Sequence, residues 1–118
     1  MNKLKGMMMI VVALVLCAGV AVAGQVGGPK THIDTVAAFQ TDVYNLQFWG
    51  EKPARILVNG DGDSDLDCIV LDQGGHTVAV DADNTDACVL NWVPAWTGPF
   101  KLKIINRGGA NRYVVMTN

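Results

Sequence analysis

Two acidic segments carry most of the side chains that could do chemistry in this chain. The segment "NGDGDSDLDC" places aspartates at alternate positions, which are Asp61, Asp63, Asp65 and Asp67. A second segment, "DADNTDA", adds Asp81, Asp83 and Asp86. Carboxylates are oxygen ligands that Ca²⁺ prefers, and a calcium site takes about six to eight oxygens. The pattern therefore raises the hypothesis that some of these aspartates bind calcium.

The spacing of the aspartates leaves a second interpretation open. Alternate residues of an extended strand lie about 6.6 Å apart, too far to share one ion unless the backbone bends. Gly60 and Gly62 permit such a bend. An EF-hand loop is excluded, because it would need glycine at position 66 and glutamate at position 72, where the chain has Leu66 and Asp72. The alternative is that the carboxylates are solvated turn and edge residues that bond their own backbone.

Three tryptophans are the other candidate binding residues. Trp92 alternates with apolar positions and is predicted to lie in the core, whereas Trp49 and Trp96 fall at a strand end and in a turn. Exposed tryptophans at such places could stack on sugar rings or form a protein-binding patch. Alternatively, they close the ends of a small domain. Trp49 and Trp96 are therefore candidate ligand-binding residues.

Catalytic constellations are not apparent in the sequence. The two histidines, His32 and His76, lie in the leader region and at a hairpin, and no nucleophile-elbow sequence surrounds Ser64, the only serine. Zinc motifs and phosphate-binding loops are absent as well. We therefore expect a protein that is not an enzyme and has no cofactor except, under the hypothesis above, calcium.

The first 23 residues have the pattern of a secretory signal peptide. Lys3 and Lys5 precede an apolar run, and Ala21-Val22-Ala23 supplies the small-x-small pattern read by signal peptidase. We predict cleavage between Ala23 and Gly24; the alternative is a retained membrane anchor. The protein is then exported, to the periplasm or the extracellular space. Loss of the two lysines changes the net charge from −2 to −4, which argues against nucleic acid or an anionic membrane as partner.

Two cysteines, Cys68 and Cys88, remain after this cleavage. An even number of cysteines in an exported protein favours a disulfide. Two buried free thiols are the alternative, because pairing needs Cα atoms within about 7 Å.

The elements that must position these residues are short strands. From residue 41 onward, apolar and polar residues alternate with the period of two that is typical of half-buried strands. The segments are "VYNLQFW", "ARILVNG", "DLDCIVLD", "HTVAVDA", "CVLNWVP", "FKLKIIN" and "RYVVMTN". Turn residues separate them. We therefore predict an all-β fold, a jelly-roll-like antiparallel β-sandwich of two sheets and about seven strands over residues 41–118.

Residues 24–40 are expected to lie outside this sandwich as a flexible leader. Within them, residues 31–40 ("THIDTVAAFQ") are compatible with one helical turn or a loose lead-in strand, and the pattern does not separate the two.

A series of short motifs follows in order over residues 41–118. The series comprises Asp65-Leu66-Asp67, Asp72, Trp92 with Pro94, Thr97-Gly98, Asn106 with Gly108, and Asn111-Arg112-Tyr113. In order and spacing these motifs resemble the bacterial pre-peptidase C-terminal (PPC-like) β-sandwich domains. The chain departs from that pattern at Cys68, where an aliphatic residue is usual, and at "GEKPAR", where a pair of glycines is common.

The resemblance implies an exported, non-catalytic module that accompanies a secreted peptidase or stands alone, and it makes a role for calcium plausible. We therefore expect a binding or structural module whose partner is a protein or a polysaccharide. A carbohydrate-binding module that uses Trp49 and Trp96, and an accessory module of a secreted hydrolase, are the alternatives. The oligomeric state does not follow from the sequence.

Overall fold

The computed structural model describes residues 23–62 and 64–118, so nearly all of the predicted signal peptide (1–22) and Asp63 lie outside the described residues. Eight strands make up the fold. They are β1 (Thr31–Val36), β2 (Thr41–Phe48), β3 (Ala54–Asn59), β4 (Leu66–Leu71), β5 (Thr77–Asp81), β6 (Ala87–Trp92), β7 (Gly98–Asn106) and β8 (Asn111–Thr117). Within these residues there is no helix long and apolar enough to cross a membrane.

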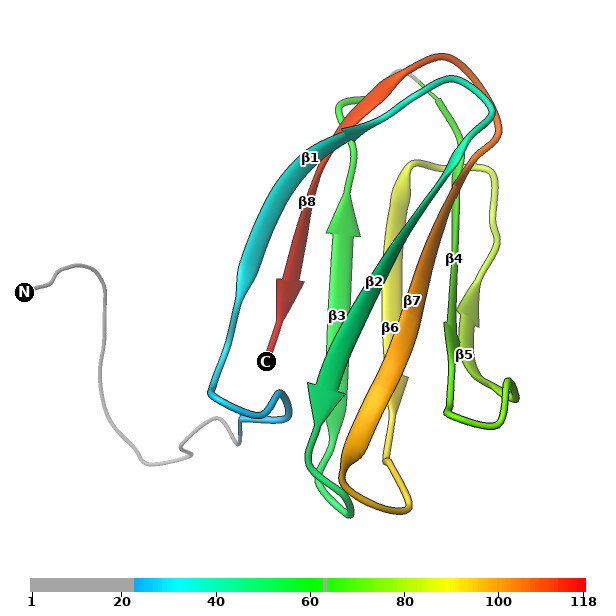
Figure 1. The fold of residues 1–118 in the computed structure, drawn as a ribbon. Helices are drawn as coiled ribbons and strands as arrows, with labels where there is room; N and C mark the ends of the chain where they lie inside the picture. The colour runs from blue at the N-terminus through cyan, green and yellow to red at the C-terminus, as the bar shows by residue number, and fades with distance from the viewer. Residues whose placement is uncertain (1–22, 63) are drawn as a thin grey trace, which may run out of the picture.

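The strands form two antiparallel sheets of four, in the orders β1-β8-β3-β6 and β2-β7-β4-β5 (Figure 1). The predicted all-β, two-sheet class is therefore confirmed. The seven strands expected from residue 41 onward correspond to β2 to β8, and β1 is an eighth.

The expectation of a flexible leader over residues 24–40 is wrong where this segment pairs with the sandwich, and of the two alternatives for residues 31–40 the structure has a strand. Residues Thr31–Val36 form β1, which pairs with β8 from Thr31 opposite Met116 to Val36 opposite Asn111. Nearer the start, Gln25 forms an isolated β-bridge with Phe48. Of the six side chains in β1 only that of Val36 is fully buried, so the strand has little hydrophobic periodicity. Backbone pairing to the edge of a sheet holds it in place, and the sequence does not reveal such pairing.

The core lies between the two sheets and follows the alternation of the sequence. In β3, for example, Ala54, Ile56 and Val58 are buried, and in β4 Leu66, Cys68 and Val70 are buried. Strands β2, β3, β4, β6, β7 and β8 contribute alternate side chains, because successive residues of a strand point to opposite faces. Trp92 is half-buried and packs against this core.

A partly buried series of hydrogen bonds joins β8 to β2 through two tyrosine hydroxyls and one carboxylate. Tyr113 in β8 is fully buried, and its hydroxyl donates to Asp42 Oδ2 at 2.5 Å. The hydroxyl of Tyr44 lies 2.7 Å from that of Tyr113 and must be the donor, since Tyr113 has only one proton to give. Burial raises the pKa of both phenols above the ordinary value, so both stay protonated at neutral pH. Tyr113 of the "NRY" motif is thus a structural residue.

Candidate functional site

The two ends of the sandwich differ in chemistry. The loops β1–β2, β3–β4, β5–β6 and β7–β8 lie at one end, and the loops β2–β3, β4–β5 and β6–β7 lie at the other (Figure 1). The first end contains the described aspartates of both acidic segments, and we call it the acidic end. The second contains Trp49 and Trp96, and we call it the aromatic end.

The two acidic loops converge at the acidic end. The backbone N–H of Gly60 donates to the carbonyl of Asp86 at 2.9 Å, and that of Leu66 donates to the carbonyl of Thr85 at 3.0 Å. The N–H of Gly62 donates to the carboxylate of Asp86. Loops that are far apart in sequence therefore form one surface.

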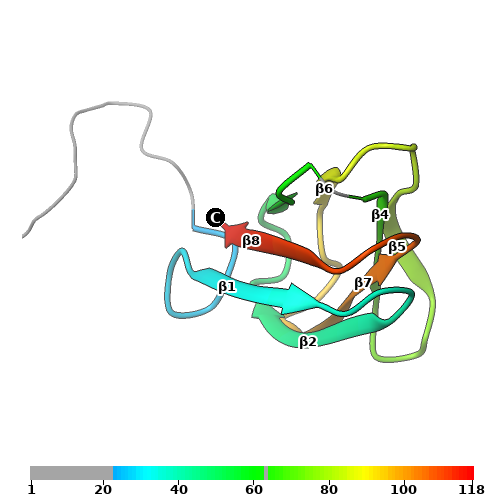
Figure 2. The same cartoon turned by 90° about the horizontal axis from the view of Figure 1, so that it is seen from above.

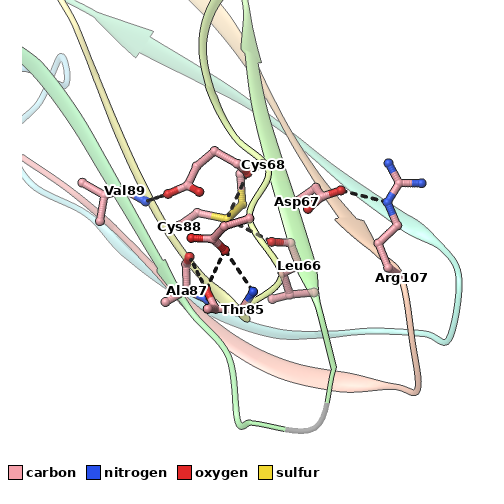
Figure 3. The surroundings of a disulfide bond; sticks show 10 residues. Leu66, Asp67, Cys68, Thr85, Ala87, Cys88, Val89 and Arg107 are labelled. Atoms are coloured by element: carbon pink, nitrogen blue, oxygen red, sulfur yellow. Dashed lines mark hydrogen bonds and ion pairs between the residues drawn. A yellow bond between two sulfur atoms is a disulfide. The ribbon is translucent and has the colours of Figure 1, made fainter.

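Most of the aspartate side chains at this end accept hydrogen bonds from the protein itself. Asp81 Oδ2 accepts from Val89 N at 2.9 Å and so covers part of the open edge of β6 (Figure 3). Asp67 Oδ2 pairs with Arg107 Nε at 2.9 Å. Further bonds run from Arg112 N to Asp61 Oδ2, from Thr85 N and Oγ1 to Asp83 Oδ1, and from Asn111 Nδ2 to Asp86 Oδ2. These carboxylates serve as caps for turns and strand edges.

The residues at the acidic end do not gather into a metal centre. Within residues 23–62 and 64–118, no group of three or more His, Cys, Asp or Glu side chains is placed to hold a metal ion. Two carboxylate oxygens, Asp65 Oδ1 and Asp67 Oδ1, are buried without a hydrogen-bond partner. Two such oxygens are far fewer than a calcium ion takes. Asp63 lies outside the described residues, and the calcium hypothesis stays a prediction.

The surroundings of Asp65 disfavour the charged form of its carboxylate. Desolvation is the largest cause that raises its pKa, and the negative charges of Asp67 and Asp83 raise it further. A raised folded-state pKa means that the charged carboxylate destabilises the fold at neutral pH, and that this penalty disappears as the pH falls through that pKa.

We therefore expect the substitution Asp65→Asn to raise Tm at pH 7 by about 1–3 °C. The difference from wild type should shrink on acidification, because the wild-type side chain then also becomes neutral. Thermal melts of both proteins between pH 7 and pH 4 provide the measurement. A lower Tm for the variant at pH 7, and only when calcium is present, would instead show that a cation compensates the carboxylate.

Two buried asparagines tie the loops of the acidic end together. Asn106 Nδ2 donates to the carbonyls of Val36, Ala37 and Gly109 at 3.3, 3.1 and 2.8 Å. Its Oδ1 accepts from the hydroxyl of Ser64 at 2.8 Å and from Gly108 N at 3.0 Å. Asn111 Oδ1 accepts from Asp61 N at 3.0 Å. Ser64 therefore has a structural partner. Asn106 of the "N-x-G" motif connects these loops by its side-chain hydrogen bonds, and we call it the loop clamp.

At the aromatic end, the β2–β3 loop packs against the β6–β7 loop. Gly50 N donates to Thr97 Oγ1 at 2.9 Å, and Glu51 N donates to the carbonyl of Pro94 at 2.7 Å. A Cβ at Gly50 would lie 2.6 Å from the backbone of Trp96, so only glycine allows this approach. Trp49 and Trp96 consequently sit on loops that contact each other.

The β4–β5 hairpin presents a carboxylate beside these loops. Asp72 Oδ1 accepts from the backbone N–H groups of Gly74 and His76, each at 2.9 Å, and lies 3.2 Å from His76 Nδ1. These hydrogen bonds, with that from the His76 backbone the strongest influence, lower the pKa of Asp72. The carboxylate is thus held ionised and in a defined place.

An open hollow of about 310 Å³ lies between the hairpin and the β6–β7 loop. Its aromatic walls are Trp92, Trp96 and Phe100, and the rings of Trp92 and Phe100 lie 5.5 Å apart. Asp72, Val78, Val93, Pro94 and Ala95 complete the lining. The volume is near the lower limit of ordinary small-molecule sites.

A second, smaller hollow of about 180 Å³ adjoins the first. The two share Asp72 and Phe100. Polar side chains of Asn45, Gln73 and Lys101 contribute to the lining of the second hollow. The apolar, aromatic hollow therefore continues into one to which several polar side chains contribute.

The tryptophan prediction is met only in part by this arrangement. Trp96 is 55% exposed and lines the hollow, whereas Trp49 is 41% exposed but is not among the lining residues. Trp92, which was predicted to lie in the core, is half-buried: it packs against the core, with its ring 4.9 Å from that of Phe48, and it also forms a wall of the hollow. Its place at the end of β6, directly before the "VPAW" turn, is the sequence signal that could have indicated this role.

Comparison with family models and with curated proteins finds no relative of this chain. No family model matches the chain, and no curated protein matches it. The resemblance to PPC-like domains therefore stays a prediction.

Proposed function

We propose that this chain is an exported, non-catalytic binding module that holds a carbohydrate ligand at its aromatic end. The observation that carries the proposal is the pair of adjoining hollows, one walled by Trp92, Trp96 and Phe100 and the other lined by polar side chains. Binding sites of this kind combine an apolar surface with a few placed polar groups.

A sugar matches this combination. The faces of its ring carry C–H groups that pack on aromatic rings, and its edges carry hydroxyls that need donors and acceptors. The charged carboxylate of Asp72 is an acceptor shared by both hollows, while Asn45 and Lys101 offer donors in the second.

Export and the lack of catalysis have separate support. The disulfide between Cys68 and Cys88 is consistent with an oxidising compartment outside the cytoplasm. Hydrolysis of a glycosidic bond usually needs two carboxylates flanking it. Among the described residues that line the two hollows, Asp72 is the only carboxylate. If the PPC-like resemblance holds, the module would serve a secreted hydrolase by keeping it on a polysaccharide.

The test is a comparison of two tryptophan variants at the same end of the molecule. A glycan array with the exported protein identifies a ligand, and titration of that glycan against tryptophan fluorescence gives its affinity. We expect Trp96→Ala to weaken binding about tenfold or more, as loss of a central aromatic contact does. Trp49→Ala is the matched control, because Trp49 is also exposed but lies outside the hollow.

Two outcomes would contradict the proposal. One is an array without any bound glycan. The other is a glycan whose affinity falls in the Trp49 variant but not in the Trp96 variant, since the ligand would then lie elsewhere on the aromatic end.

A further inference from the structure

The residue that follows the predicted cleavage site is built into the fold. Gly24 is buried, its N–H donates to the carbonyl of Asn118 at 3.1 Å, and its own carbonyl accepts from Trp49 N at 2.9 Å. Gln25 N donates to the same carbonyl of Asn118 at 2.8 Å. Figure 2 accordingly places the blue start of the described chain beside the end of β8. The chain at residue 24 is thus a closing strand segment and not a free tail.

Oxygen atoms surround Gly24 closely. A Cβ added to this residue would lie 2.5 Å from Asn118 Oδ1 and 2.7 Å from the carbonyl oxygen of Pro53. Together with the Asn118 carbonyl, these atoms form what we call the oxygen cradle. No side chain fits there, so glycine is needed at position 24 for a reason unrelated to turns. Asn118 Oδ1 also accepts from Arg55 N at 2.9 Å, and the Pro53 carbonyl accepts from Asn118 Nδ2 at 3.0 Å. Oxygen acceptors close to the backbone at Gly24 suit a positive charge.

We infer that the Ala23–Gly24 bond is the processing site and that the oxygen cradle receives the α-ammonium group which cleavage creates. Hydrolysis adds one water across the peptide bond, so that Ala23 leaves with a carboxylate and Gly24 keeps a protonated amine. The small-x-small pattern at Ala21 to Ala23 and the cradle at Gly24 are independent observations that indicate the same bond. The ammonium can donate three hydrogen bonds where the peptide N–H donated one.

The same geometry sets the order in which cleavage and folding occur. In the folded chain Gly24 and Gln25 are buried, and backbone hydrogen bonds hold them to Asn118 and Trp49, which directly follow β8 and β2. A protease must take the chain around the scissile bond into its own site in an extended form. Cleavage therefore precedes closure of this segment, and closure then gains charge-assisted hydrogen bonds. The inference does not depend on the ligand of the aromatic end.

The experiment compares chains that differ only at residue 24 or just before it. One form starts at Gly24 with a free amine, one starts at Gly24 with the amine acetylated, and one starts at Ala23. We expect the free Gly24 form to melt several degrees above the other two at pH 6. Its advantage over the acetylated form should disappear as the pH rises, because an α-amino group ordinarily titrates near pH 8 and contacts that favour the ammonium raise that pKa in the folded state.

A second measurement concerns the cell. N-terminal sequencing of the exported protein should begin at Gly24. A different first residue would overturn the inference, as would an acetylated form that melts at the same temperature as the free form or a difference that does not change with pH. All three chains keep glycine at position 24, so none of them places a side chain in the cradle and failure to fold does not obscure the result.

Discussion

Replacing Asn106 by alanine is expected to lower the free energy of unfolding by about 3–5 kcal/mol. The side chain of Asn106 is buried, donates to three backbone carbonyls and accepts from Gly108 N and the hydroxyl of Ser64. Truncation removes all of these bonds at once and leaves several partners buried without a substitute. For a domain of this size the loss corresponds to a fall in Tm of more than about 12 °C.

The control for this variant is Asn91→Ala. Asn91 is an exposed residue of β6 and has the same side chain, so its truncation should change the free energy of unfolding by less than about 0.5 kcal/mol. Urea titrations of both variants and of wild type provide the values. If the Asn106 variant lost less than about 1 kcal/mol, the loops of the acidic end would not depend on this clamp.

Removing the disulfide is expected to have an effect of similar size. Cys68 in β4 and Cys88 in β6 join the two sheets across the core, with 20 residues of sequence separation and a Cα–Cα distance of 6.2 Å (Figure 3). A cross-link that closes a loop of this length is worth about 3 kcal/mol, chiefly because it restricts the unfolded chain. Both cysteines are fully buried, so their replacement also leaves space in the core.

The double substitution Cys68→Ala and Cys88→Ala should therefore lower Tm by about 12–20 °C. Wild-type protein unfolded and refolded in reductant provides the matched control, because it lacks the cross-link but keeps both side chains. We expect its Tm to fall between those of the oxidised protein and the double variant. Intact mass with and without reductant shows the redox state of each sample. A double variant that melts within a few degrees of oxidised wild type would contradict the prediction.

The predictions that succeeded depend on local geometry. The burial of Ile56, Leu66 and Leu90 follows from alternation within single strands, which needs no knowledge of the partners. The same alternation placed Cys68 and Cys88 on inward faces, and their proximity across the core makes the disulfide possible. The acidic turns were recognised as well, since Asp and Asn residues are typical of turns.

The predictions that failed depend on contacts between distant segments. β1 has one fully buried side chain, so backbone pairing with β8, about 80 residues away in the sequence, is what stabilises it in the sheet. Trp92 packs against the core, as its spacing predicts, but that spacing did not reveal that its half-buried ring also lines a hollow at the end of the sandwich. Trp49 and Trp96 have similar exposure, and only the packing of their loops decides that one lines the hollow and the other does not.

The sequence by itself determined the class of the fold, the inward faces of β2, β3, β4, β6, β7 and β8, and the presence of acidic and aromatic turns. Tertiary structure alone decided that β1 completes a sheet, that Asp86 caps the backbone at Gly62, and that Trp92, Trp96 and Asp72 share one hollow. The physical reason is the range of the interactions. Side-chain alternation is a property of neighbouring residues, whereas strand order, loop contacts and hollows depend on the free energy of the whole packed chain.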